Sequence, residues 1–201
     1  MDAMQEYVPQ LLELLPVLAE CSDICYALNS QGDLIYCNRS WDDFASRNGG
    51  AACLTLKALG KNICEVLPSD LKEFFVRGFD AARNSGFWEH DFECPSPAEF
   101  RTYRMRVVPL ADGGWLIRNA LLHSHTLKQI PVDLERFRDS HGIFNLCSHC
   151  RKANVMGTNE WLWVPQLVAS KNLRISHGLC EVCLHYHYGN FLPQVAKVSS
   201  R

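Results

Sequence analysis

Two pairs of closely spaced cysteines constrain the fold of this chain more than any other feature of its sequence. Cys147 and Cys150 form one C-x2-C motif, Cys180 and Cys183 form a second, and 29 residues separate the two motifs. A C-x2-C turn places two thiolates about one tetrahedral edge apart, so two such turns complete a four-sulfur shell for Zn²⁺. The spacing therefore predicts a small C-terminal module built around a structural zinc ion.

Other chemistry for these cysteines is less well supported by the neighbouring residues. A redox dithiol or disulfide switch remains the main alternative. The usual c-type haem attachment is excluded, because Arg151 and Leu184 stand where that motif needs histidine. A closed four-cysteine shell leaves no position for a reactive water, which argues for a scaffold and against catalysis. His177, three residues before Cys180, is a possible substitute ligand if one cysteine does not bind.

The composition predicts a soluble globular protein with two folded units. Of its 201 residues, 47% are hydrophobic and 21% are charged, which is enough apolar material to bury a core. No run of about 18 apolar residues is present, and the first residues are acidic where a secretory signal would be basic. We therefore expect a cytoplasmic protein without a membrane segment. In that compartment its ten cysteines would stay reduced.

The charge is unevenly distributed along the chain. Residues 1–140 hold 14 basic and 20 acidic side chains, whereas residues 141–201 hold 6 basic and 2 acidic ones. Proteins that bind nucleic acid usually carry a much denser basic stripe. Nucleic-acid binding is therefore possible in principle but weakly supported.

Hydrophobic periodicity predicts a mixed α and β region upstream of the cysteines. Residues 24–28 and 34–37 are strand-like and flank turn residues, which indicates a hairpin. Residues 69–86 have the clearest helical pattern, with large apolar side chains on one face. Three further strands are predicted over residues 87–94, 100–110 and 115–123.

A separate amphipathic segment precedes the hairpin. Residues 8–20 have helical apolar spacing, and Pro16 is expected to kink the helix or start a new turn. The apolar positions are Val8, Leu11, Leu12, Leu15 and Leu18. This leader helix is a candidate seam for a homodimer.

Three segments resemble parts of PAS domains: DICYALNSQGDLIYCNRSWDDFA, LGKNICEVLP and FRTYRMRVVPL. The order of the predicted elements also resembles that of a PAS sensor domain: a hairpin, short helices, a long helix and three strands. The resemblance covers residues 21–122. It implies an α+β fold in which a five-stranded antiparallel sheet with flanking helices encloses a pocket.

The coloured cofactors of PAS proteins are disfavoured by this sequence. The light-sensing branch carries its reactive cysteine directly after the Asn of the GxN segment, whereas here Ile63 follows and Cys64 comes one residue late. Photoactive yellow protein has its chromophore cysteine after a later Pro, and here Ser69 occupies that place. Haem-binding members often use a histidine of the long helix, which has none here. His90, on a predicted strand, is more typical of a structural residue. The pocket ligand and its contact residues stay unassigned.

The cysteine segment also resembles a short tail found on PAS and response-regulator proteins in bacterial signalling, through C-x2-C-R-K and SHGLCEVC. We therefore predict a zinc-ribbon-like module after the PAS-like domain. Within this module, a short Trp-containing helix is expected between the two cysteine motifs. The expected organisation is a leader at 1–20, the PAS domain at 21–122, a linker at 123–145, the module at 146–190 and a tail at 191–201.

These features together favour a non-enzymatic, bacterial, cytoplasmic protein of sensory signal transduction. Its PAS domain would sense a ligand, a redox state or a partner, and its zinc module would contact a signalling protein. No catalytic residue stands out, because no nucleophile and base occur at a recognisable spacing. The alternatives are a transcription-linked regulator that binds nucleic acid and a thiol redox sensor that uses the four cysteines.

Overall fold

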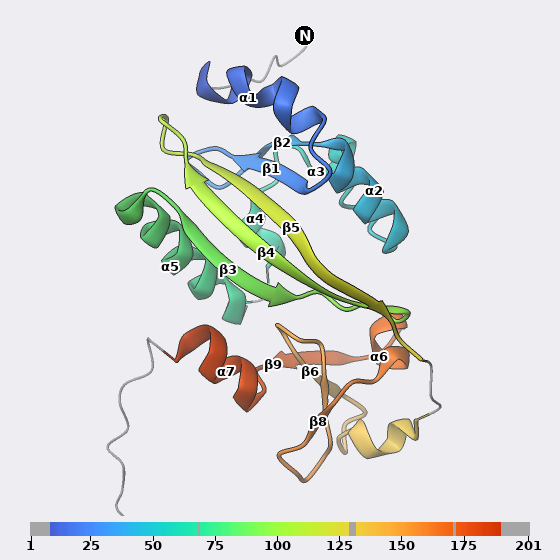
Figure 1. The fold of residues 1–201 in the computed structure, drawn as a ribbon. Helices are drawn as coiled ribbons and strands as arrows, with labels where there is room; N and C mark the ends of the chain where they lie inside the picture. The colour runs from blue at the N-terminus through green and yellow to red at the C-terminus, as the bar shows by residue number, and fades with distance from the viewer. Residues whose placement is uncertain (1–8, 68, 129–131, 171, 190–201) are drawn as a thin grey trace, which may run out of the picture. The chain divides into compact units, whose positions relative to one another are not determined.

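The structure, a computed structural model, describes residues 9–67, 69–128, 132–170 and 172–189. It separates into two compact units, Met1–Lys128 and Gln129–Arg201 (Figure 1). The first residues of the expected leader and the expected tail lie outside the described residues. Within the described part of the chain, no helix is long and apolar enough to cross a membrane.

The strands of the first unit form one sheet in the order β2-β1-β5-β4-β3, with every neighbouring pair antiparallel. They are β1 (Ile24–Leu28), β2 (Leu34–Cys37), β3 (Trp88–Glu93), β4 (Glu99–Pro109) and β5 (Trp115–Thr126). The predicted hairpin and the three later strands are therefore confirmed. The last strand, β5, continues past the predicted end at residue 123, because its pairing with β4 runs as far as Thr126.

Four helices connect β2 to β3. They are α2 (Arg39–Arg47), α3 (Thr55–Ala58), α4 (Ile63–Val66) and α5 (Ser69–Ser85). The predicted long helix is α5, which lies along one face of the sheet over β3 and β4 (Figure 1). Its Gly78 permits this close approach, since a Cβ there would lie 2.3 Å from the Trp88 ring.

Helix α1 (Pro9–Ala19) packs on the face of β1 that is opposite to α2. Side chains alternate between the faces of a strand, so Cys25 and Ala27 meet α1 while Tyr26 faces α2. Leu11 is 0% exposed and Leu18 is 8% exposed at this contact. Most of the leader's apolar face is thus used within its own domain, and a dimer seam stays a prediction.

The second unit contains a small sheet in the order β8-β7-β6-β9. Its elements are η1 (Leu134–Phe137), β6 (Phe144–Cys147), β7 (Ala153–Asn154), β8 (Trp161–Leu162), α6 (Pro165–Ala169), β9 (Ile175–Gly178) and α7 (Glu181–Tyr188). A compact apolar core holds these elements together. Its buried residues are Phe137, Phe144, Leu146, Ala153, Val155, Val164 and Leu167.

Two details differ from the sequence-based expectations. The expected linker, 123–145, contains the end of β5, the turn η1 and the start of β6, because Phe137 and Phe144 are core residues. The expected helix between the cysteine motifs is shorter than predicted. Residues Trp161 and Leu162 form the edge strand β8, and the helix begins only at Pro165.

Candidate metal centre and ligand pocket

Parallel pairing of β6 with β9 brings the two cysteine motifs together. Cys147 ends β6 and lies opposite Gly178, the last residue of β9. The carboxyl ends of parallel strands meet at the same edge of a sheet, so the residues that follow each strand become neighbours. Cys150 and Cys180 therefore meet although 30 positions separate them in the chain.

The first motif is a tight turn between β6 and β7. Its closing hydrogen bonds run from the Cys147 amide to the Lys152 carbonyl (2.8 Å) and from the Arg151 amide to the Cys147 carbonyl (3.0 Å). Among the described residues other than glycine, Arg151 alone has a positive φ, 61°. Such a backbone costs of order 1 kcal/mol for a residue with a side chain. Strain of this kind is typical of functional sites.

The second motif begins helix α7. Cys180 is the N-cap, and its sulfur accepts a hydrogen bond from the Cys183 amide at 3.4 Å. The Cys180 amide in turn donates to the Cys147 sulfur at 3.5 Å. Amides of a helix N-terminus favour negative charge, so they stabilise thiolates here. The module is zinc-ribbon-like in joining two C-x2-C motifs, with a helix start in place of the second turn.

The four sulfur atoms form one buried cluster. They all lie within 4.8 Å of one another, and the four residues are between 0% and 7% exposed. The Cys150 and Cys180 sulfurs are 3.8 Å apart. A tetrahedral shell with Zn–S bonds of about 2.3 Å requires sulfurs about 3.8 Å apart, so the cluster has the dimensions and donor set for zinc.

Contacts among the four cysteines shift the pKa values of their thiols. Hydrogen bonds from the thiols of Cys150 and Cys183 hold the pKa of Cys147 well below its usual range. The hydrogen bond with Cys147 is the largest cause that raises the pKa of Cys150, to about 12, and burial raises it further. A lowered thiol pKa favours the thiolate, which is the state that a metal ion needs for binding.

The aromatic residues around the sulfur cluster are mainly structural. Trp161 packs directly against the four cysteines. His187 is buried and stacks on His149 with ring centroids 3.6 Å apart. His185 is exposed and bonds the Glu181 carbonyl of its own helix. His177, the substitute ligand considered above, is exposed on β9 and is not a member of the sulfur cluster.

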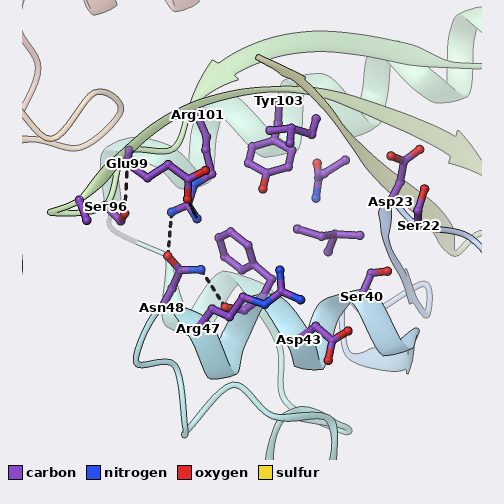
Figure 2. Close-up of a pocket in the computed structure, with 15 residues that line it drawn as sticks. Ser22, Asp23, Ser40, Asp43, Arg47, Asn48, Ser96, Glu99, Arg101 and Tyr103 are labelled. Atoms are coloured by element: carbon purple, nitrogen blue, oxygen red, sulfur yellow. Dashed lines mark hydrogen bonds and ion pairs between the residues drawn. The ribbon is translucent and has the colours of Figure 1, made fainter. Parts of the chain in front are cut away.

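A pocket of about 490 Å³ opens in the first unit between α2 and the sheet (Figure 2). Its lining includes Arg101 on β4, a charged residue that is only 7% exposed. The Arg101 guanidinium donates to Asn48 Oδ1 (2.7 Å), to the Cys94 carbonyl (3.1 Å) and to Glu99 Oε2 (3.3 Å). It also lies over the Phe44 ring, 5.1 Å from the ring centroid.

A second, apolar pocket of about 290 Å³ adjoins the first. Both pockets are lined by five of the same residues: Ile24, Phe44, Asn48, Tyr103 and Asn119. The apolar pocket adds the rings of Trp41 and Phe92 to the shared residues. The two pockets form one space with a polar half (the mouth) and an apolar half (the interior).

Comparisons with known proteins find matches among solved structures. No protein-family model matches the sequence, and no curated protein sequence matches it. A PAS domain from Colwellia psychrerythraea is 16% identical with a TM-score of 0.42, over 56% of this chain and 97% of that one. The PAS domain of Bordetella pertussis BvgS is 16% identical with a TM-score of 0.38, over 56% and 82%. A sensory box histidine kinase from Vibrio cholerae is 15% identical with a TM-score of 0.37, over 56% and 91%.

The strand order of the first unit decides its fold. An antiparallel sheet β2-β1-β5-β4-β3, with short helices and the long α5 between β2 and β3, is the arrangement that the PAS resemblance implied. The first unit has a PAS-like fold.

In the PAS-like domain, the GKN segment has a structural role. Asn62 caps α4 by accepting from the Cys64 amide at 3.0 Å. Its amide nitrogen donates to the Gln31 carbonyl (2.7 Å) and to Asp33 Oδ1 (3.0 Å), which ties α4 to the β1–β2 turn. Cys64 lines neither of the two pockets described above.

Burial shifts the pKa of one histidine and two thiols of the PAS-like domain. His90 lies 4.8 Å from the Phe74 ring and stacks on Trp88, and burial lowers its pKa. Burial is also the largest cause that raises the pKa of Cys25 and that of Cys37 to about 12. These two thiols are therefore protonated at neutral pH and are poor nucleophiles.

Sequence reasoning missed Arg101, Asn48 and Arg47, which line the pocket mouth. A signal for Arg101 was present. Along β4 it occupies the same alternating phase as Tyr103 and Met105, which are buried. A charged residue in the inward phase of a strand is unusual and indicates a paired or functional group. The two α2 residues carried no comparable signal.

Proposed function

We propose that this protein is a non-enzymatic sensory protein. Its PAS-like domain receives a signal at the pocket, and its second unit, stabilised by zinc, transmits the signal through protein contacts. The observation that carries the proposal is the four-sulfur cluster, buried and of zinc dimensions, in the same chain as a PAS-like domain with an open pocket. A closed four-sulfur shell favours a structural ion over a catalytic one.

A structural metal is also expected from the size of the second unit. Its apolar core has seven buried residues, and its strands have two to four residues each. Units this small rarely bury enough apolar surface to fold without a metal, disulfides or a partner. Zinc bound to the four cysteines would supply the missing stability.

Helix α7 offers a surface for the output contact. Val182 and Tyr186 are 74% and 61% exposed, and they lie four positions apart on one helix face. Exposed apolar side chains on one face are typical of protein interaction sites. This supports a protein partner, the first of the classes that the sequence suggested.

The proposal is tested first by metal content. The full-length protein, purified under reducing conditions and reconstituted with zinc, is expected to hold about one zinc per chain by elemental analysis. Its visible spectrum is expected to be featureless, because haem and flavin are disfavoured. A haem or flavin band would make the pocket a cofactor site.

Matched variants locate the zinc. Cys180→Ser removes a buried cluster member and should abolish stoichiometric zinc, whereas Cys53→Ser changes an exposed thiol of the PAS-like domain and should leave it intact. Equal zinc contents in the two variants, or zinc-free wild-type protein, would contradict the structural-zinc part of the proposal.

The thiol redox sensor is the second candidate, supported by the contacts among the four sulfurs. In that case mild peroxide would release zinc before global unfolding, and retention of zinc would count against it. The nucleic-acid alternative gains no support from charge. The described residues 132–170 and 172–189 hold five basic and five acidic side chains, which is not a basic stripe.

A further inference from the structure

The pocket of the PAS-like domain has two chemically different halves. Its mouth contains charged and hydroxyl side chains, including Arg47, Arg101 and Ser40. The interior is lined by the rings of Phe44, Phe92 and other aromatic residues. A ligand that fills both halves must therefore be amphipathic, with an apolar body and a polar end.

The carboxylates at the mouth already have cationic partners. Asp23 pairs with Arg118 at 2.6 Å. Glu99 pairs with Arg101 at 3.3 Å. Asp43 lies 3.9 Å from Arg39 on the same helix. These acidic groups are therefore poorly suited to attract a cationic ligand.

The cations at the mouth retain binding capacity. Three of the five N–H donors of Arg101 are used by Asn48, Glu99 and the Cys94 carbonyl, which leaves two. Arg47, on α2, has no ion-pair partner within the described part of the chain. In Figure 2 both arginine side chains are directed toward the same space as the Tyr103 hydroxyl. The uncommitted charge of the pocket is therefore positive.

Two further polar atoms lie where the halves meet. Tyr103 is 7% exposed and lines both pockets, with its ring stacked on Phe92 at 5.8 Å. Asn119 also lines both, and its Oδ1 is buried without a hydrogen-bond partner among the described residues. An unpaired buried acceptor is costly and needs a donor, which a water molecule or a hydroxyl group on the ligand ring would supply. A carboxylate has no hydrogen to donate, so this oxygen bears on the apolar end of the ligand and not on its charge.

We propose that this pocket binds a small aromatic carboxylate, with the ring in the apolar interior and the carboxylate between Arg47 and Arg101. The ring would pack among Trp41, Phe44 and Phe92, as aromatic side chains pack with one another. The carboxylate would accept from guanidinium groups, which bind planar anions best. This inference rests on the proposed sensory function, because it names the class of signal that the domain receives.

Three probes separate the contributions of charge and ring. Isothermal titration calorimetry of the zinc-loaded, full-length protein would compare phenylacetate, its neutral analogue phenylacetamide, and acetate. Phenylacetate should bind at least about ten-fold more tightly than either of the others, since only it has both parts. Equal affinities for phenylacetate and phenylacetamide would overturn the proposal. So would an affinity for phenylacetate weaker than about 10 mM.

Two variants test the position of the charge. Arg47→Gln should weaken phenylacetate binding about three- to ten-fold and leave phenylacetamide binding unchanged, because the exposed guanidinium contacts only the anion. Lys57→Gln removes a charge from an exposed position of α3 that lines neither pocket, and should change little. Equal effects of the two variants would overturn the assignment of Arg47. Neither residue is in a buried core, so both variants are expected to fold.

Amide hydrogen exchange distinguishes this inference from the proposed function. If phenylacetate binds with the predicted charge dependence but protects only pocket residues, the ligand assignment stands and the sensory proposal fails. If phenylacetate does not bind while zinc is held by the four cysteines, only the ligand assignment fails. Protection that extends into α1 or the second unit would support both.

Discussion

Asn38 joins three elements of the PAS-like domain through its side chain. It is 3% exposed and caps α2 by accepting from the Trp41 amide at 3.2 Å. The same oxygen accepts from the Cys25 amide of β1 at 3.1 Å. Its nitrogen donates to the carbonyls of Asp23 (2.8 Å) and Cys21 (3.1 Å), in the segment between α1 and β1. One amide thus satisfies backbone groups of α2, β1 and the end of the leader.

Replacement of this amide should be costly. We expect Asn38→Ala to lower the free energy of unfolding by about 2–4 kcal/mol, because it removes a helix cap and leaves buried backbone groups unpaired. Asn84→Ala, at an exposed position of α5, should change it by less than about 0.5 kcal/mol. Urea denaturation of both variants measures the difference. Similar midpoints would show that the Asn38 network contributes little.

Helix α1 is an integral element of the PAS-like domain. Its buried side chains pack against Cys25, Ala27 and Ile35. Leu11 is 0% exposed, whereas the adjacent Leu12 is 48% exposed. The two leucines provide a matched pair on one helix, because the substitution is the same and only the burial differs.

This pair separates packing within the domain from dimerisation. Leu11→Ala should destabilise the domain by about 2–4 kcal/mol through the loss of buried contacts and the cavity left behind. Leu12→Ala should have little effect on stability. If the exposed face of α1 is a dimer seam, Leu12→Ala should lower the mass measured by light scattering. A monomeric wild-type protein at high concentration would instead rule out the seam.

The whole molecule consists of two compact units that depend on different stabilising forces. The PAS-like domain has a five-stranded sheet covered by helices on both faces, whereas the second unit has a small core beside the sulfur cluster. We expect apolar burial to dominate the stability of the first unit. In the second unit, the proposed zinc ion would contribute a large share of the folding free energy.

Chelation should therefore unfold one unit selectively. Calorimetry of the zinc-loaded full-length protein is expected to show two transitions, and EDTA should remove the one that belongs to the second unit. The other transition should move little, because the PAS-like domain has no sulfur-cluster residue. Cys180→Ser without chelator should reproduce the EDTA result. A single transition unaffected by EDTA would contradict this division of stability.

Local patterns of the sequence were sufficient for the main elements of the PAS-like domain and for the metal-site candidates. The hairpin β1–β2 and the helix α5 lie within a residue of their predicted positions, since strand and helix periodicities depend only on neighbours in the chain. The four cysteines were visible because ligand spacing within each C-x2-C motif is also local. The positions of β3 and β4 were predicted for the same reason.

Contacts between distant residues were decided only by the tertiary structure. Parallel pairing of β6 with β9 joins the two cysteine motifs, and no local pattern records which strand pairs with which. The bond from Arg101 to Asn48 spans 53 positions, so the charged mouth of the pocket was not predictable from either segment alone. The sequence by itself determined the main elements of the PAS-like domain, their faces and the metal-site candidates. Their assembly depends on burial and hydrogen bonding between segments that meet only after folding.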